Sequence, residues 1–197
     1  MTPSHARAAL FPTPRGSTGP DRRDGITGVT RPDAASRGDD SVRWASTGWD
    51  HPDALALRTR MDAELRPRYA PFDAERAGRR PGPPAAEEIV VTWIAYGGDA
   101  PLATASLRLL HEAGTEDRYE VKRVYVHEEH RGRGLARASL DVVEDSARAL
   151  GVARLSLQTG KLQPEAMGLY ERQGWHRVAC YPPYDTDPFS VCYGKHL

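Results

Sequence analysis

The stretch that decides the fold is residues 124–136, which read VYVHEEHRGRGLA. An apolar, strand-like run leads into a short polar loop and then into a glycine-rich turn that opens an amphipathic helix. Gly132 and Gly134 let the backbone turn tightly and approach a ligand closely, and the free N–H groups at the start of the helix attract an anion. Arg131 and Arg133 add positive charge. The stretch therefore predicts a phosphate site, most naturally one for a pyrophosphate.

Spacing separates three kinds of phosphate-binding loop. A dinucleotide-binding fold needs a third small residue after the two glycines and an acid about 20 residues further on, but Arg137 and residues 154–156 stand at those places. A nucleotide P-loop needs Gly-Lys followed by Ser or Thr, but Leu162 and His196 follow the two Gly-Lys pairs of this chain. What remains is Arg-x-x-Gly-x-Ala between a strand and a helix.

The hydrophobic pattern outside this stretch predicts a mixed order of strands and helices. Strands are expected at residues 41–45, 89–95, 102–110, 120–126, 154–158, 175–180 and 189–195. Helices are expected from an Asp50 cap to a stop at Arg66-Pro67, at residues 136–150 and at residues 164–173. Residues 96–99 are typical of a hairpin turn, and residues 76–84 of a loop. The antiparallel strands come first and β-α-β-α-β-β follows, which predicts an α+β fold with a partly parallel centre.

The composition argues against a polyanion or a membrane as partner. The chain has 197 residues, with 27 Lys and Arg against 27 Asp and Glu, so its formal net charge is zero. No window approaches the roughly 18 to 20 apolar residues that cross a bilayer, and the N-terminus lacks the apolar run of a secretory signal. We therefore expect a cytoplasmic protein that binds neither nucleic acid nor membrane.

Residues 1–40 differ from the rest of the chain. Their one aromatic residue is Phe11, so they lack the apolar surface that would offset the entropy of ordering the backbone. We expect a disordered tail before a domain at residues 41–197; a mis-assigned start codon would give the same sequence. Cys180 and Cys192 belong to no Cys-x-x-Cys pair, and in a reducing compartment we expect two buried free thiols. The alternative is a disulfide, if the two residues face each other on paired strands.

The chain resembles the GNAT family of N-acetyltransferases, in a bacterial branch, from about Val42 to the C-terminus. Residues 121–126 resemble the fourth strand of that family, 131–136 its pyrophosphate loop for coenzyme A, 169–175 its LYE-x-x-GF end, and 189–195 its last strand. The family often carries Asn at the start of the helix after Gly160, where the nearest amide here is Gln163. The resemblance implies a three-layer α/β/α sandwich with a mixed central sheet flanked by helices.

The resemblance also implies direct transfer of an acetyl group from acetyl-CoA to an amine of a small molecule. Such a reaction needs a base for the ammonium, a donor for the oxyanion and an acid for the leaving thiolate. Tyr170 matches the family's acid, and Glu120 matches a carboxylate that takes the proton directly or through water. From the residues alone, Tyr170 also fits a core aromatic of its helix and Glu120 a solvated acid at a strand entrance.

For the coenzyme, the resemblance implies that the loop N–H groups hold the pyrophosphate and that the end of the fourth strand pairs with the pantetheine like an added strand. The Val124 N–H is then the candidate oxyanion donor. The expected coenzyme contacts are Val124, Tyr125, Val126, Arg131, Gly132, Arg133, Gly134, Leu135, Ala136, Arg137 and Gln163.

Two adjacent cations on the fourth strand, Lys122 and Arg123, are expected to face opposite sides of the sheet. A cation near the reaction centre suits an acceptor with a carboxylate or phosphate. Arg123 is the first candidate, because Lys122 can pair with Glu120; an internal ion pair is the alternative for either residue. If the family architecture holds, the Pro/Tyr loop adds Tyr181 and Tyr184 as candidate acceptor contacts.

A metal site is not expected. His127 and His130 are three residues apart in a loop, whereas the zinc protease motif needs histidines four apart on a helix.

Other functions stay open at this stage. The same fold could hold an acyl-CoA as a sensor without catalysis, acetylate a protein N-terminus or lysine, or serve an interaction made by residues 1–40. The acceptor is set by the helix after Trp49 and by the loops near Arg80 and Tyr184, where members of the family diverge. Both a monomer and a homodimer are compatible with the sequence.

Overall fold

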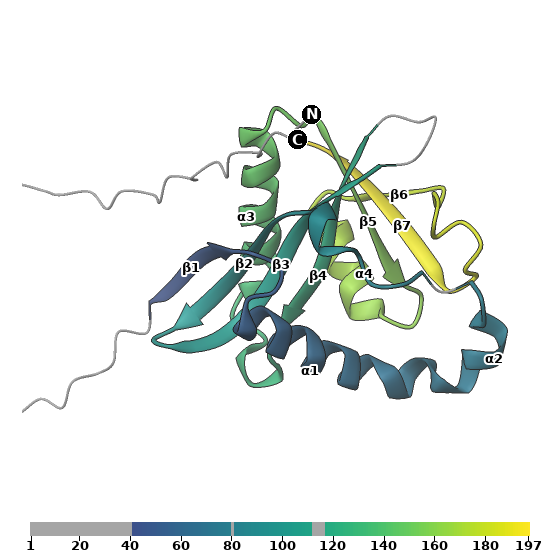
Figure 1. Ribbon diagram of the computed structural model, residues 1–197, viewed down its shortest axis with the longest axis horizontal. Coiled ribbons are helices and arrows are strands. Elements are labelled where there is room, and N and C mark those ends of the chain that lie inside the picture. The colour runs from purple at the N-terminus through teal and green to yellow at the C-terminus, as the bar shows by residue number, and fades with distance from the viewer. Residues whose placement is uncertain (1–40, 80, 112–116) are drawn as a thin grey trace, which may run out of the picture. The chain divides into compact units, whose positions relative to one another are not determined.

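The computed structural model describes residues 41–79, 81–111 and 117–197 (Figure 1). Its strands are β1 (Val42–Thr47), β2 (Ile89–Gly97), β3 (Ala100–Leu110), β4 (Arg118–Val126), β5 (Arg154–Gly160), β6 (His176–Val178) and β7 (Ser190–His196). Its α-helices are α1 (Pro52–Tyr69), α2 (Asp73–Arg76), α3 (Leu135–Ala149) and α4 (Pro164–Arg172), with 3-10 turns η1 (Ala70–Phe72), η2 (Ala86–Glu88) and η3 (Glu128–His130). The expected tail at residues 1–40 and the loop position Arg80 lie outside the described residues.

The strands form one mixed sheet in the order β1-β2-β3-β4-β5-β7-β6. β4 and β5 run parallel, and each other neighbouring pair is antiparallel. The hairpin of β2 and β3 turns at Gly98, whose φ of 60° lies in the region that favours glycine. The expected α+β class and the partly parallel centre are confirmed.

Helices cover both faces of the sheet, as Figure 1 shows. On one face, Ala54 and Leu57 of α1 pack against Ile94 and Tyr125. On the other face, a larger core joins the sheet to α3 and α4. Its fully buried helical side chains include Leu140 of α3. The expected three-layer sandwich is therefore confirmed.

A split between β4 and β5 positions the site. The two strands pair only where Glu120 and Val121 face Ser156 and Leu157, and no register partner follows further along β4. The remainder of β4 leads away from β5 into the polar loop before α3 (Figure 1). Beyond Val121, backbone groups of β4 on the β5 side are therefore free of sheet pairing with β5.

Helix α1 differs from its expected bounds at both ends. The His51 side chain, not that of Asp50, caps it by accepting a hydrogen bond of 3.3 Å from the Asp53 N–H. The helix also runs through Pro67 to Tyr69. A proline inside a helix removes one backbone hydrogen bond. We attribute the continuation to Tyr69, which is buried and anchors the last turn by accepting a hydrogen bond from the Gln163 amide at 3.2 Å.

The expectation of free cysteines is wrong, because Cys180 and Cys192 form a disulfide. The sixth strand is shorter than expected and ends at Val178, whose Cα partner in β7 is Cys192. Cys180 lies two residues beyond that pair, with 5.1 Å between the two Cα atoms of the disulfide. Pairing of the strands thus brings the two sulfurs within bonding reach.

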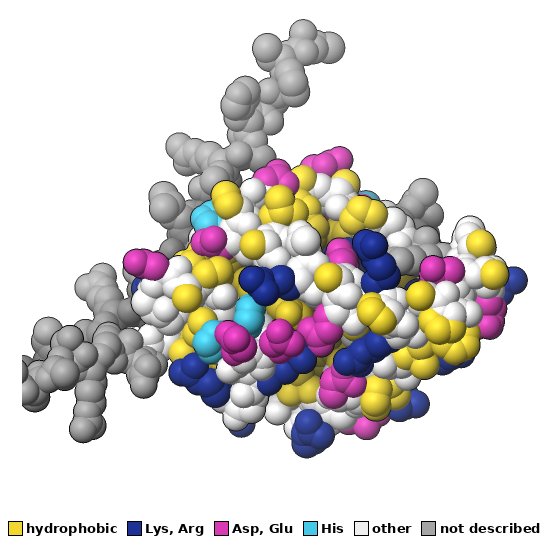
Figure 2. Space-filling model, turned by 90° about the horizontal axis from the view of Figure 1, so that it is seen from below, with side chains coloured by type: hydrophobic (Ala, Val, Ile, Leu, Met, Phe, Trp, Pro, Cys, Tyr) yellow, Lys and Arg dark blue, Asp and Glu magenta, His cyan; other side chains and the backbone are white. Residues whose placement is uncertain are grey.

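Within the described part of the chain, no helix has both the length and the apolar character needed to cross a membrane. On the face shown in Figure 2, acidic and basic side chains are intermixed among the described residues.

Candidate active site

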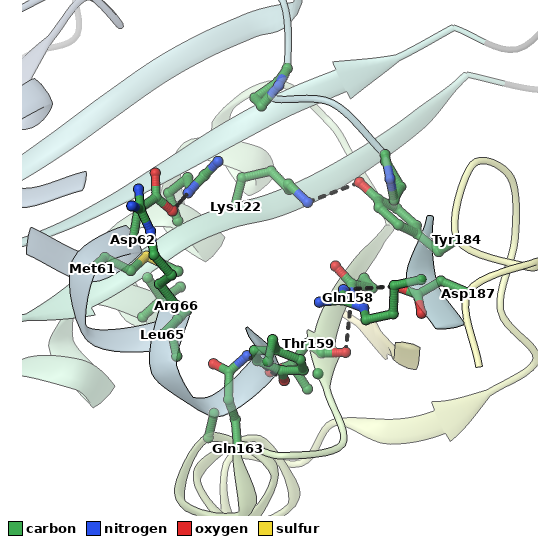
Figure 3. Close-up of a pocket in the computed structure, with 18 of the residues that line it drawn as sticks. Met61, Asp62, Leu65, Arg66, Lys122, Gln158, Thr159, Gln163, Tyr184 and Asp187 are labelled. Atoms are coloured by element: carbon green, nitrogen blue, oxygen red, sulfur yellow. Dashed lines mark hydrogen bonds and ion pairs between the residues drawn. The ribbon is translucent and has the colours of Figure 1, made fainter. Parts of the chain in front are cut away.

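Two cavities adjoin at the split. The first, which we call the loop cavity, has a volume of about 440 Å³ and is bordered by the end of β4, residues 131–137 and α4. The second, the central cavity of Figure 3, has a volume of about 650 Å³ and lies between α1, β4, the end of β5 and the loop before β7. Six residues line both cavities, namely Met61, Leu65, Val124, Gln163, Ala166 and Tyr170. Two ligands could therefore meet at Val124 and Tyr170.

The loop cavity carries the geometry of an anion site. Gly134 caps α3 with a φ of 79°, and no side chain caps the helix, so the first N–H groups of α3 are free of internal partners. The positive end of the helix dipole adds to their attraction for an anion. A Cβ on Gly134 would meet no atom within 4 Å, which leaves that space for a ligand.

All of the predicted coenzyme contacts except Arg133 line the loop cavity. The Arg133 side chain is exposed and lies 3.3 Å from His130 Nδ1 instead. Arg131 donates from Nε to the Val126 carbonyl at 3.2 Å and pairs with Glu64 at 2.5 Å. The hydrogen bond from Arg131 lowers the pKa of the Glu64 carboxyl.

Helix α1 supplies site residues that sequence reasoning missed. Met61 and Leu65, which fit a core stripe by their spacing, are half-buried and line both cavities, while Glu64 lines the loop cavity. Tyr69 was also missed: its hydroxyl lies so close to Gly160 that a Cβ there would be 1.7 Å away.

A bulge in β4 brings both strand cations to the central cavity. Arg123 has a φ of 54°, and the register with β3 shifts between Thr104 and Ser106. Lys122 and Arg123 therefore both line the central cavity, and the expectation that they face opposite sides of the sheet is wrong. Simple alternation fails because one extra residue resets the direction of the side chains.

Val124 lies in the same irregular segment and has no register partner in β3 or β5. Val124 also lines both cavities, so this irregular segment lies at their junction.

Lys122 spans one wall of the central cavity and ends at Tyr184 (Figure 3). Its Nζ donates a hydrogen bond of 2.8 Å to the Tyr184 hydroxyl, which in turn donates to Glu120 Oε2 at 3.1 Å. Arg108 donates to the same hydroxyl at 3.1 Å and to Glu120 at 3.3 Å, and Tyr181 donates to Glu120 Oε1 at 2.7 Å. Burial raises the pKa of both tyrosines, which keeps them protonated as donors.

Glu120 is fully buried and lines neither cavity. Both of its carboxylate oxygens are occupied by the donors just described. Glu120 is therefore not a solvated acid, and these donors stand between its carboxylate and the central cavity; a role as base through water stays a prediction. Toward the central cavity, Glu120 contacts the Tyr184 hydroxyl at 3.1 Å and Lys122 Nζ at 3.9 Å.

Tyr170 lies at the junction of the two cavities and in the core at once. Its ring packs 6.4 Å from Trp175 and 5.7 Å from Tyr193, between centroids. Burial is the main cause that raises its pKa, so the phenol stays protonated at neutral pH. Among the described residues, none hydrogen-bonds its hydroxyl.

Further charges on the central cavity occur mostly in pairs. Arg123 pairs with the half-exposed Asp62 of α1 at 2.6 Å, and Arg76 pairs with the buried Asp187 at 2.8 Å.

Away from both cavities, His127, Glu129 and His130 place potential ligand atoms within 4.8 Å of one another, although the sequence predicted no metal there.

Comparison with known proteins identifies the family. Residues 55–175 match the profile of the Acetyltransferase (GNAT) family. The chain belongs to this family, whose members transfer the acetyl group of acetyl-CoA.

Relatives and solved structures agree with this assignment. The chain is 40% identical over 84 residues to an IAA acetyltransferase from Azospirillum brasilense, a match that covers 42% of this chain and 55% of that protein. The chain thus spans about half the length of this curated relative. A putative acyl-CoA N-acyltransferase from Klebsiella pneumoniae is similar in structure, with a TM-score of 0.62, 26% identity, and coverage of 81% of this chain and 99% of the other.

A GNAT family acetyltransferase from Elizabethkingia anophelis, solved with acetyl-CoA bound, shares the fold. Its TM-score is 0.54 at 15% identity, over 81% of this chain and 99% of the other.

Proposed function

We propose that the protein transfers an acetyl group from acetyl-CoA to the amine of a small molecule that carries an acidic group. The observation that carries this proposal is the junction of the loop cavity and the central cavity at Val124 and Tyr170. One cavity suits the coenzyme and the other an acceptor. The shared wall is where a thioester and an amine would meet.

The coenzyme part of the proposal rests on the loop cavity. Free N–H groups at the start of α3 would hold the pyrophosphate, with Arg131 alongside. The unpaired segment at Val124 would pair with the pantetheine, and the Val124 N–H would donate to the oxyanion that forms on attack.

Tyr170 would protonate the leaving thiolate of coenzyme A. As the C–S bond breaks, the thiolate of coenzyme A takes a proton from the Tyr170 phenol. The raised pKa of this phenol keeps the proton available until a strong base forms beside it. Gln163, at the start of α4, lines both cavities and would contact the coenzyme near the same point.

We assign the binding of the acceptor's acidic group to Arg123, with Lys122 as the second candidate. Arg123 lines the central cavity and is paired through NH1 with Asp62, whose side chain is 48% exposed. An exposed ion pair contributes little to stability, so a ligand anion can compete with Asp62 for the guanidinium. Tyr184 would close the opposite wall.

The activity is tested by a free-thiol release assay with acetyl-CoA and a panel of acidic, neutral and polycationic amines, lysine-containing peptides and peptides with free N-termini. We expect turnover with an acidic small amine. Turnover only with peptides would move the function to protein acetylation. Binding of acetyl-CoA without turnover of any amine would leave an acyl-CoA sensor as the function.

Replacing Arg123 tests the acidic group separately. Arg123→Gln should raise KM for acidic amines by about 10-fold, which corresponds to about 1.4 kcal/mol of lost binding, and should spare neutral amines. Asp62→Asn is the matched control, because it frees Arg123 from its partner and should leave or improve the KM of acidic amines. Equal KM changes for acidic and neutral amines would contradict the assignment.

A further inference from the structure

Glu120 is buried and lines neither cavity, so a group on the wall of the central cavity is better placed to take a proton from an ammonium there. The titratable side chains that line it include Lys122, whose Nζ lies within the cavity wall (Figure 3). The Lys122 side chain is 12% exposed, and its amine is 3.9 Å from Glu120 Oε2. We propose that Lys122 takes the proton of the acceptor ammonium, a role that rests on the proposed function.

The hydrogen bonds around Lys122 leave its amine free to act. Tyr184 Oη accepts from Lys122 and donates to Glu120, which orients Nζ without using more than one of its positions. The nearest carboxylate, Glu120, already accepts from Tyr181, Tyr184 and Arg108. The remaining positions on Nζ can face a ligand in the cavity.

The surroundings of Lys122, burial above all, lower its pKa and so favour loss of its proton. Burial is the main cause that lowers its pKa, the positive charges of Arg108 and Arg123 lower it further, and the nearby carboxylates oppose this shift. The charged and titratable groups that face Nζ are Glu120 and Arg123 of β4, Arg108 of β3, Glu88 of η2, and Tyr184 of the loop before β7. A neutral Lys122 can accept a proton, and Glu120 then stabilises the ammonium that forms.

The proton steps balance for a primary amine, whose ammonium loses two N–H protons on becoming an amide. The first N–H bond breaks as a bond to Lys122 Nζ forms, and this proton later passes to solvent. The freed electron pair of the amine attacks the thioester carbon, and the C–S bond breaks. The thiolate takes a proton from the Tyr170 phenol. The second proton of the nitrogen then passes to the Tyr170 oxygen and restores the phenol.

Two variants separate proton transfer from charge. Lys122→Arg keeps the positive charge but has no neutral form near physiological pH that could accept a proton. Lys122→Met removes both the positive charge and the proton acceptor. If Lys122 is the proton acceptor, both variants lose about 10²-fold or more in kcat. Raising the pH toward the pKa of the acceptor amine should then restore part of the rate, because solvent supplies the neutral amine. Lys161→Arg is the matched control, since Lys161 is exposed and lines neither cavity.

The opposite pattern would overturn the proposal. If Lys122→Arg retains kcat while Lys122→Met raises KM for acidic amines alone, Lys122 is an anchor for an anion. A loss of rate that does not change with pH would make its role structural.

A measurement without any acceptor distinguishes this proposal from the proposed function. The chain has three lysines, at positions 122, 161 and 195, so an NMR titration of 15N-labelled lysine side chains gives three signals. The signal absent from Lys122→Arg belongs to Lys122. Its midpoint should lie below the value of about 10.4 for a free lysine side chain. A midpoint at or above that value overturns the role of Lys122 alone, whereas binding of acetyl-CoA without turnover of any amine overturns the proposed function and this role with it.

Discussion

At the scale of single residues, Tyr170 belongs to the core and to the walls of both cavities at once. Its ring fills a space beside Trp175 and Tyr193, while its position on the wall shared by both cavities keeps it within reach of ligands. The two sequence interpretations of Tyr170, a core aromatic and an acid, are therefore compatible. The hydroxyl and the ring can be tested apart.

We expect Tyr170→Phe to lower kcat by about 10²-fold while the affinity for acetyl-CoA stays nearly unchanged, because the substitution removes only proton donation in the transition state. The raised pKa means that the wild-type donor stays protonated through neutral pH, so donation should not be lost there. Steady-state kinetics and calorimetric titration of acetyl-CoA give the two readouts. Tyr193→Phe is the control, because its hydroxyl contacts Glu171 and its side chain lines neither cavity. Equal kcat in wild type and Tyr170→Phe would leave Tyr170 with a packing role alone.

Glu120 marks the limit of sequence reasoning at this scale. Its position in the chain suggested a carboxylate near the amine, but its burial depends on partners distant in sequence. Arg108 is 12 residues away, Tyr181 61 and Tyr184 64. Local spacing shows none of these contacts, because they arise only when the sheet and the loop before β7 come together.

At the scale of elements, the glycine-rich turn and the start of α3 together form one wall of the loop cavity. The turn could be predicted from the sequence because backbone conformation, not a distant contact, selects its glycines: Gly132 and Gly134 both have positive φ. The bulge at Arg123 and the passage of α1 through Pro67 could not, since each contradicts a local preference that packing overrides.

Gly134→Val should abolish most of the rise in melting temperature that acetyl-CoA produces in the wild type. A β-branched residue at a φ of 79° is strained, and its side chain would occupy the space open to the pyrophosphate. Gly98→Val is the matched control: Gly98 also has positive φ and open space, but it lies in the β2–β3 turn away from both cavities. The control should lower the melting temperature itself and keep the rise on binding. An unchanged rise in Gly134→Val would place the coenzyme elsewhere.

At the scale of the whole molecule, the sequence was sufficient for the sheet, the layers and the family, because hydrophobic periodicity and four ordered blocks determine them together. It was insufficient for the central cavity, which α1, the β4 bulge and the loop before β7 build jointly. The disulfide joins the two ends of the segment that carries Tyr181 and Tyr184, and Cys192 packs with both rings.

The Cys180–Cys192 disulfide can be tested by counting thiols and by measuring stability. Thiol titration of the unfolded, unreduced protein should find no free thiol, whereas the reduced protein should show two. Because the crosslink restricts the unfolded chain, reduction should lower the free energy of unfolding by about 2 to 4 kcal/mol, measured by urea denaturation. Cys180→Ala, which leaves Cys192 as a buried thiol, should reproduce the loss and should not respond to reductant.

The same reduction should act unequally on the two cavities. Tyr184 orients Lys122 in the central cavity, so loosening its loop should raise KM for the acceptor. The loop cavity is built by α1, β4, α3 and α4 without that segment, so the affinity for acetyl-CoA should stay unchanged. Equal losses on both sides would mean that the crosslink supports the fold as a whole. Two free thiols in the unreduced protein isolated from its cell would contradict the disulfide and would support the reducing cytoplasm that was expected from the sequence.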